Sequence, residues 1–422
     1  MTPAGPDHLK SLAAVAAVGL LLWVATGCGS DDGGDGSGTG NGKNASARSN
    51  SGDNTSGSSA NSGSTGTTGA TGGSVATTAP GTTGAELAGG LRVFAAESPW
   101  NTEVAGLPVD SRSAQMLELA TGRRAVREVP GREGVETFTR KVNRGLYINT
   151  DAWAPLVVEG GAEGGVTTKF VCRQSRCGSK EFKAPETLNI PPNTTPDPRY
   201  DGWLSVIDRD QGIGYDFWRA RRQTDDSISY QYAKGWSLDG PGFSQPVAVD
   251  AQRAVGARGS GLPLFAGLIG SDELSGGRID HALAISVPGL ARRNFVQPAS
   301  VTDGLGSPRS LPAGARVRLR SSVDFEDRLG NLKGSRRRSA DAILQALRQY
   351  GAIVVDRSIV PTLYAPKGTS DELVDGNELS HLKLGDFEVV QLPAVYKDPP
   401  LSKVTQVGPT TAVTDSSTGG DQ

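Results

Sequence analysis

Histidine is rare in this chain of 422 residues, and one of its three histidines lies in an apolar stretch, GRIDHALAISVP, at Gly277–Pro288. Read as a strand, the stretch places His281 on one face with Ile279, Leu283, Ile285 and Val287. A histidine in such a row is either a hydrogen-bonded core residue or a general acid or base at a site that the row lines. The sequence leaves both interpretations open.

A carboxylate partner for His281 must come from another part of the fold. Asp280 is adjacent to His281 but points to the opposite face of the strand. The candidates elsewhere in the chain are Asp208, Asp216, Glu273 and Asp303.

Two tryptophans and an aspartate are predicted to share one face of a hairpin. If RDQG forms the turn, paired residue numbers sum to 421, which places Asp216 opposite Ser205 and Trp218 opposite Trp203. The other face, which we predict to be core, carries Leu204, Val206, Tyr215 and Phe217.

Indole faces stack on sugar rings, and a carboxylate can bind hydroxyl groups or act as an acid or base. The face with Trp203, Asp216 and Trp218 therefore indicates a carbohydrate site, unless it too is buried and Asp216 pairs with an arginine. Tyr230 and Tyr232 share a face of the next predicted strand, where they either extend the aromatic surface or belong to the core.

Asp216 and His281 are the catalytic candidates, and the reaction class stays open. A glycoside hydrolase needs two carboxyl groups across the scissile bond, and the sequence does not identify the partner of Asp216. A polysaccharide lyase would use a histidine or tyrosine base beside a positive charge. No metal site or cofactor is expected, because His281 and His381 are far apart in sequence and no phosphate-binding loop or dinucleotide motif is present.

Short runs of alternating apolar and polar residues, separated by glycine and proline, predict strands and turns. These strands would position the candidate side chains. We expect a mainly β fold, an antiparallel β-sandwich or jelly roll with two or three peripheral helices. The predicted helices are Ser111–Ala120 and Ser339–Tyr350, the second with Ser339 as N-cap and Gly351 as its stop. The arginine run 336–338 is placed in a solvated loop before it.

The N-terminus has the pattern of an export signal. An apolar run from Leu12 to Val24 is too short to span a bilayer, and it ends in VATGC. This ending resembles the lipobox of bacterial lipoproteins, with Ala25 where leucine is usual. The resemblance implies cleavage after residue 27, acylation of Cys28 and anchoring in membrane lipid on the extracytoplasmic side of the cell membrane.

Composition divides the rest of the chain. Residues 28–85 form a Gly/Ser/Thr-rich tether, 91–392 a single β-rich domain, and 399–422 a low-complexity tail predicted to be disordered. Cys172 and Cys177 are expected to form a disulfide, as is usual for an isolated pair in an exported protein. The net charge of −2 gives no electrostatic support for nucleic-acid binding.

Several stretches resemble a family of exported bacterial and fungal proteins whose members mostly have no assigned activity. They are SPWNTEVAGLPVDSRSAQM, DGWLSVIDRDQGIGYDFWRAR, SGLPLFAGLI followed by GRIDHALAISVP, FVQPAS and ILQALRQYGAIVVD. The likeness spans Glu97–Asp356 and implies a secreted β-rich domain, often accompanied by carbohydrate-binding modules. That family more often has Tyr-Glu-x-Trp where this chain has Asp216.

Together these features predict a cell-envelope lipoprotein whose β-rich domain binds or cleaves a polysaccharide. The alternative is a non-catalytic wall-binding, structural or interaction lipoprotein.

Overall fold

The computed structural model describes residues 91–128, 135–178, 182–245, 256–397 and 405–407. They all belong to one compact unit, Thr77–Gln422, and a second unit, Met1–Ala76, lies outside the described residues. The predicted signal peptide, Cys28 and the tether also fall outside them.

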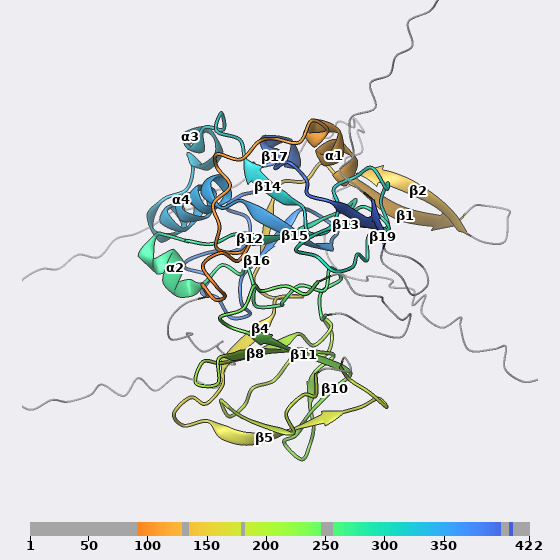
Figure 1. The fold of residues 1–422 in the computed structure, drawn as a ribbon. Coiled ribbons are helices and arrows are strands. Elements are labelled where there is room, and N and C mark those ends of the chain that lie inside the picture. Colours follow the sequence, from red (N-terminus) through yellow and green to blue (C-terminus); the bar gives the residue numbers. More distant parts are fainter. Residues whose placement is uncertain (1–90, 129–134, 179–181, 246–255, 398–404, 408–422) are drawn as a thin grey trace, which may run out of the picture. The chain divides into compact units, whose positions relative to one another are not determined.

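Strands in five sheets dominate the part of the chain that the structure describes, which confirms the prediction of a β-rich fold. The largest sheet (Figure 1) has the order β17 (Phe387–Val389), β14 (Arg316–Leu319), β15 (Ala352–Arg357), β12 (Leu283–Val287), β16 (Thr362–Tyr364), β3 (Tyr147–Asn149). We call this the six-stranded sheet.

Two sheets of four strands accompany it. The inner one has the order β11 (Tyr232–Ser237), β8 (Ile213–Trp218), β7 (Leu204–Asp208), β4 (Leu156–Glu159). The outer one has the order β6 (Thr187–Ile190), β5 (Val166–Cys172), β10 (Ile228–Tyr230), β9 (Arg221–Arg222).

The two remaining sheets are small. One is the hairpin of β1 (Gly122–Glu128) and β2 (Val135–Lys141), and the other has the order β13 (Asn294–Val296), β18 (Val395–Lys397), β19 (Thr405–Val407). Strand β19 lies within the segment 399–422 that the sequence analysis assigns to the tail, and it pairs antiparallel with β18.

Helices are few among the described residues: α1 (Ser113–Ala120), α2 (Ser271–Gly276), α3 (Phe325–Leu329), α4 (Gly334–Gln349) and the 3-10 helix η1 (Leu384–Asp386). Helix α4 contacts α2, α3 and β14, and Figure 1 shows these helices together beside the six-stranded sheet.

Most strand pairs in the described part of the chain are antiparallel, as expected, and parallel pairs occur beside them. Parallel pairs join β12 to β15, β16 to β3, β4 to β7 and β10 to β5. Parallel neighbours need long connections, and the one from β12 to β15 contains α3 and α4. The sandwich or jelly-roll arrangement stays a prediction.

The predicted hairpin register is confirmed. Ser205 pairs with Asp216 and Val206 with Tyr215 in the β7–β8 hairpin. The face predicted to be core packs against β5, β6 and β10, so the two four-stranded sheets bury a shared core.

Strand β12 is buried on both faces. Leu283, Ile285 and Val287 belong to the core with α1 and α4, whereas Ala282 and Ala284 belong to a second core with Trp203 and Ile207 of the β7 segment. The six-stranded sheet therefore packs on the inner four-stranded sheet through this second core.

Two predicted elements have different bounds. The stretch 227–238 is not one strand but two, because Gln231 separates β10 from β11, which belong to different sheets. Helix α4 begins at Gly334, so the arginine run lies inside it. Arg337 bonds to Asp341 one turn later, at 2.9 Å, and also pairs with Glu326, which supports this early start.

Two smaller predictions hold. Gly351, with φ of 67°, stops the chain from continuing as a helix after α4 and its C-cap, Tyr350. The N–H of Gly351 donates to Ala346 O at 2.9 Å. Cys172 and Cys177 form a disulfide, with their Cα atoms 5.7 Å apart.

Candidate functional site

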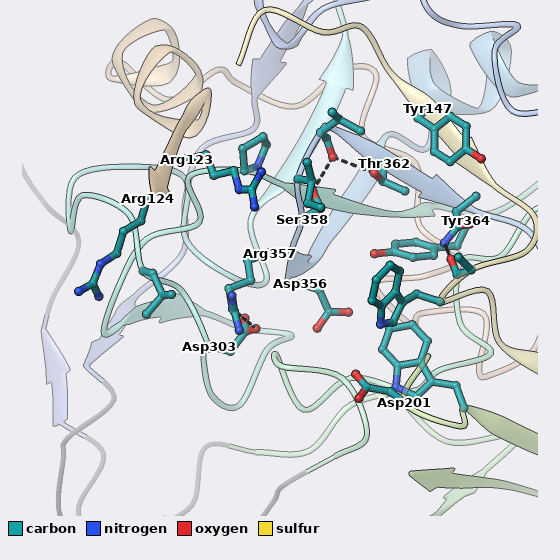
Figure 2. Close-up of a pocket in the computed structure, with 18 residues that line it drawn as sticks. Arg123, Arg124, Tyr147, Asp201, Asp303, Asp356, Arg357, Ser358, Thr362 and Tyr364 are labelled. Carbon is teal, nitrogen blue, oxygen red and sulfur yellow. Dashed lines mark hydrogen bonds and ion pairs between the residues drawn. The ribbon is translucent and has the colours of Figure 1, made fainter. Parts of the chain in front are cut away.

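A cavity of about 520 Å³ opens at the carboxyl ends of the parallel strands β12 and β15. Its wall combines three aspartates, Asp201, Asp303 and Asp356, with a set of aromatic residues, Tyr147, Trp153, Trp203 and Tyr364. Figure 2 shows the three carboxylates around the middle of this cavity, which we call the acid pocket. The carboxyl ends of parallel strands are a common place for ligands, because loops with free polar groups begin there.

Asp356 is the most enclosed of the three carboxyl groups, with its side chain 10% exposed. One oxygen accepts the N–H of Gly259 at 2.6 Å, and the other lies 3.2 Å from Arg258 Nη1. Burial raises the pKa of Asp356 to about 7; Arg258 lowers it, while the charge of Asp303 raises it further. At neutral pH this group therefore holds a proton for a substantial part of the time.

Asp303 lies beside Asp356 and shares a neighbour with it. Its Oδ2 lies 3.0 Å from Arg357 Nε, and a Cβ on Gly259 would be 2.3 Å from its Cγ. Glycine at 259 thus lets both carboxyl groups contact the same piece of backbone. Burial raises the pKa of Asp303, against the opposing effect of Arg357. Its Oδ1 is buried and has no hydrogen-bond partner among the described residues.

Asp201 supplies the third carboxyl group, from an uncommon backbone conformation. Its φ is 62°, in the left-handed region, and its carbonyl accepts the N–H of Arg219, which is also left-handed at 53°. Burial raises its pKa, opposed by the charge of Arg219 and a hydrogen bond from Trp218. Backbone conformations of this kind gather at ligand sites.

Aromatic side chains form another part of the wall. The Arg258 guanidinium lies over both the Trp203 ring, at 5.7 Å, and the Tyr364 ring, at 4.9 Å. The indole nitrogen of Trp203 is buried without a hydrogen-bond partner in the described part of the chain. Trp153 is 40% exposed, has φ of 56°, and stacks edge-on against Tyr200. A sugar ring could stack on such a surface while its hydroxyl groups reach the carboxylates.

The neighbouring Asp303 and Asp356 can divide acid and base roles. Two carboxyl groups in contact with one backbone segment do not both ionise easily, so one keeps its proton. The ion pair with exposed Arg357 favours the charged form of Asp303, and the deeper burial of Asp356 favours its protonated form. This gives one proton donor and one proton acceptor in the same cavity.

Asp216, the predicted catalytic carboxylate, lies in the interior, which is the buried alternative that the sequence left open for this face. Its side chain accepts hydrogen bonds from Ser205 Oγ at 2.6 Å, Trp236 Nε1 at 2.9 Å and the N–H of Leu264 at 2.8 Å. Burial raises its pKa to about 6, and these three bonds act against the rise. Packing of the six-stranded sheet on the inner sheet covers this face of the hairpin.

The four predicted aromatic residues separate. Trp203 lines the acid pocket, and Trp218, half-buried, donates a hydrogen bond to Asp201. Tyr230 and Tyr232 are 5% and 6% exposed and lie in different sheets, so neither extends an open surface. Both tryptophans are thus associated with Asp201, because Trp218 bonds to it and Trp203 lines the same cavity.

His281 is enclosed at 2% exposure and lines neither of the cavities described here. Glu273 is its carboxylate partner, with Oε1 3.0 Å from Nε2, and its Nδ1 donates to Ala282 O at 2.9 Å. Burial lowers the pKa of His281, but the nearby Glu273 carboxylate and the hydrogen bond to Ala282 outweigh it, so the pKa is raised overall. The other oxygen of Glu273 accepts the N–H of Gly270 at the start of α2. This arrangement is that of a core histidine that holds α2 to the segment before β12.

Reasoning from sequence missed Asp201 and Asp356 and named Asp303 only as a remote partner for His281. One signal was present for Asp356: the run AIVVDRS changes from apolar to charged at the end of a buried strand. Asp201 precedes a glycine in a turn and carries no comparable signal.

Among the described residues, no group of three or more His, Cys, Asp or Glu side chains is arranged to hold a metal ion. In that same part of the chain, no helix has the length and apolar character needed to cross a membrane. The chain matches no family model, no curated protein and no solved structure.

Proposed function

We propose that this protein binds a polysaccharide in the acid pocket and hydrolyses it by general acid–base catalysis. Asp356 donates a proton to the leaving oxygen, and Asp303 serves as the base or nucleophile. The observation that carries this proposal is the contact of Asp303 and Asp356 with the same glycine, in a cavity with aromatic walls.

The state of the candidate bases favours hydrolysis over elimination by a lyase. Burial raises the pKa of Tyr364 far above its ordinary value and also raises that of Tyr147, so both pocket tyrosines are poor bases. His281 lies outside the pocket lining. The pocket is therefore better equipped to deliver a proton than to remove one from carbon.

In this proposal the protein works at the cell envelope. Acylated Cys28 anchors it in membrane lipid on the extracytoplasmic side, and the tether up to residue 85 lets the β-rich domain reach polymers of the wall or the surroundings.

The test is to incubate the purified full chain with wall and plant polysaccharides and to follow the products. New reducing ends without ultraviolet absorbance would support hydrolysis, whereas unsaturated products absorbing in the ultraviolet would show a lyase. Binding without release would favour the alternative of a non-catalytic wall-binding lipoprotein. If no polymer is bound or cleaved, the proposal fails.

A further inference from the structure

The acid pocket continues into a second hollow. This hollow has a volume of about 720 Å³ and lies against the β1–β2 hairpin and residues 305–308. Arg124 and Leu305 line both cavities, so the two are adjacent, and we call the pair of cavities the groove. A ligand that fills the groove must be longer than the acid pocket itself.

Positive charge dominates the outer part of this groove. Arg123 and Arg124 line the acid pocket, and Arg124 and Arg292 line the second hollow. All three are exposed, and none has an ion-pair partner within the described ranges. Figure 2 shows Arg123 and Arg124 on the side of the pocket away from Tyr147 and Tyr364.

Each carboxylate of the groove has a cation of its own nearby, which for Asp201 is Arg219. Arg258 pairs with Asp356 and Arg357 with Asp303, while Glu118 in the second hollow lies 2.6 Å from Lys141. The three arginines Arg123, Arg124 and Arg292 are therefore in excess along the path from the acid pocket to the second hollow. Arginine suits this place because its planar guanidinium binds carboxylate and phosphate in bidentate fashion.

We propose that the groove selects an anionic linear glycan, one that carries carboxylate or phosphate groups along its chain. This inference rests on the proposed function and specifies its substrate class. The sugar at the cleavage point lies against the aromatic wall and the carboxyl pair, and the anionic groups of neighbouring sugars bind Arg124 and Arg292.

The test compares the binding of three polymers to the full chain by affinity electrophoresis: polygalacturonate, the same polymer after carboxyl reduction, and polyribitol phosphate. We expect at least one anionic polymer to bind roughly tenfold more tightly than the neutral one, with an affinity that falls as salt is added. The two anionic probes separate carboxylate from phosphate recognition. Equal affinity for the neutral polymer, or no binding of either anionic polymer, would overturn the inference.

Two variants that each remove three positive charges test whether the preference for anionic polymers comes from the groove. The combination Arg123→Gln, Arg124→Gln and Arg292→Gln should lose at least about tenfold in affinity and most of the salt dependence. The control replaces three exposed cations that line neither cavity: Lys169→Gln, Arg176→Gln and Arg221→Gln. The same loss in the control would also overturn the inference, and thermal unfolding of each variant checks its fold.

Failure of this inference can be told apart from failure of the proposed function. Hydrolysis of neutral polymers alone leaves the proposed function standing and removes the charge selection. Arginine-dependent binding of an anionic polymer without cleavage keeps the charge selection and removes hydrolysis.

Discussion

Asp356 combines burial, an arginine partner and a neighbouring carboxyl group, and its pKa of about 7 is the result of all three. A carboxylic acid that is still protonated near neutral pH can donate to a leaving group, which an ordinary surface aspartate cannot do. The first prediction therefore concerns this side chain.

Asp356→Asn removes the proton donor but keeps the shape of the side chain. We expect polysaccharide cleavage to fall by about 10²–10⁴-fold while binding persists. The control is Asp110→Asn, since Asp110 is also buried, at 3% exposure, beside an arginine, but does not line the acid pocket. Equal loss in both variants would attribute the effect to general destabilisation.

The pH dependence of cleavage follows from the same group. Asp356 must hold its proton to act as the acid, so kcat/KM should fall as pH rises through about 7. The variant Asp201→Asn should leave the pH of this decline nearly unchanged, because the largest effects on the pKa of Asp356 come from burial, Arg258, Asp303 and Gly259. A rate that stays flat from pH 6 to 9 would contradict the role of Asp356.

His281 yields a prediction about stability. The pKa of His281 in the folded state lies above its ordinary value of about 6.5. Protonated His281 paired with Glu273 therefore stabilises the fold fully below about pH 6.5, and this contribution is lost as pH rises through the folded-state pKa. Glu273→Gln removes the charged partner and should lower the free energy of unfolding by about 1.5–3 kcal/mol at mildly acid pH.

Urea unfolding of wild type and Glu273→Gln at pH 6 and pH 9 measures this difference, which should be smaller at the higher pH. The neighbouring Asp272→Asn is the control, since it removes an equal charge from the exposed first turn of α2. A difference that grows with pH would exclude the protonated His281–Glu273 pair.

At the scale of single residues, the sequence predicted which residues pair across the hairpin but not which of them are buried. The predicted RDQG turn correctly placed Asp216 opposite Ser205, since the register of a hairpin depends on its turn. Whether the resulting face meets solvent depends on the six-stranded sheet, whose strands come from distant parts of the chain. The same limit left Glu273 as one of four candidate carboxylate partners for His281.

Among the elements, the segment Arg258–Leu264 connects the acid pocket to the interior. Arg258 donates to the carbonyls of Pro263 and Leu264 and also contacts Asp356, so the segment folds back on itself with the arginine at its centre. Gly259 is the point at which both carboxyl groups meet this segment.

Gly259→Ala tests how closely the two carboxyl groups are held. The added Cβ would lie 2.3 Å from Asp303 Cγ, so Asp303 must shift. A displacement of about 1 Å can cost on the order of 10²-fold in rate, and we expect cleavage to fall by roughly that amount. Gly106→Ala is the control, because a Cβ there meets no atom within 4 Å. Unchanged cleavage in Gly259→Ala would show that the spacing of the carboxyl groups is not critical.

Element boundaries were predictable where a local signal dominated. Gly351 ended its helical segment as expected, because a left-handed residue is a local requirement. The start of α4 at Gly334 was missed, since it depends on ion pairs with Glu326 and Asp341 rather than on a capping side chain. The break at Gln231 was also missed, because residues 228–237 alternate like a single strand.

For the whole molecule, composition supported the β-rich class but not the mixture of parallel and antiparallel pairs. The parallel pair β12–β15, at whose carboxyl ends the acid pocket opens, joins segments that are far apart in sequence. Only the assembled sheet brings Asp356 and Asp303 to one place, so no motif in the sequence could contain the site.

The proposed lipid anchor gives the last prediction. Cys28→Ser removes the acylated thiol and should move the protein from the membrane fraction to the soluble fraction, because acyl chains contribute roughly 0.8 kcal/mol per buried CH₂ and the tether is poor in apolar residues. Fractionation with metabolic palmitate labelling measures both changes. As the control, Cys172→Ser with Cys177→Ser should keep the label, and wild-type protein without label would contradict lipidation.

The hydrogen bond from the N–H of Leu264 to Asp216 has an evolutionary consequence. Glutamate at this position would be longer than aspartate by one methylene. A chain with glutamate must seat the segment Arg258–Leu264 farther from β8, and Arg258 and Gly259 would move with it. Side-chain length at 216 and the conformation of that segment should therefore change together among relatives, since otherwise the interior substitution would displace the acid pair.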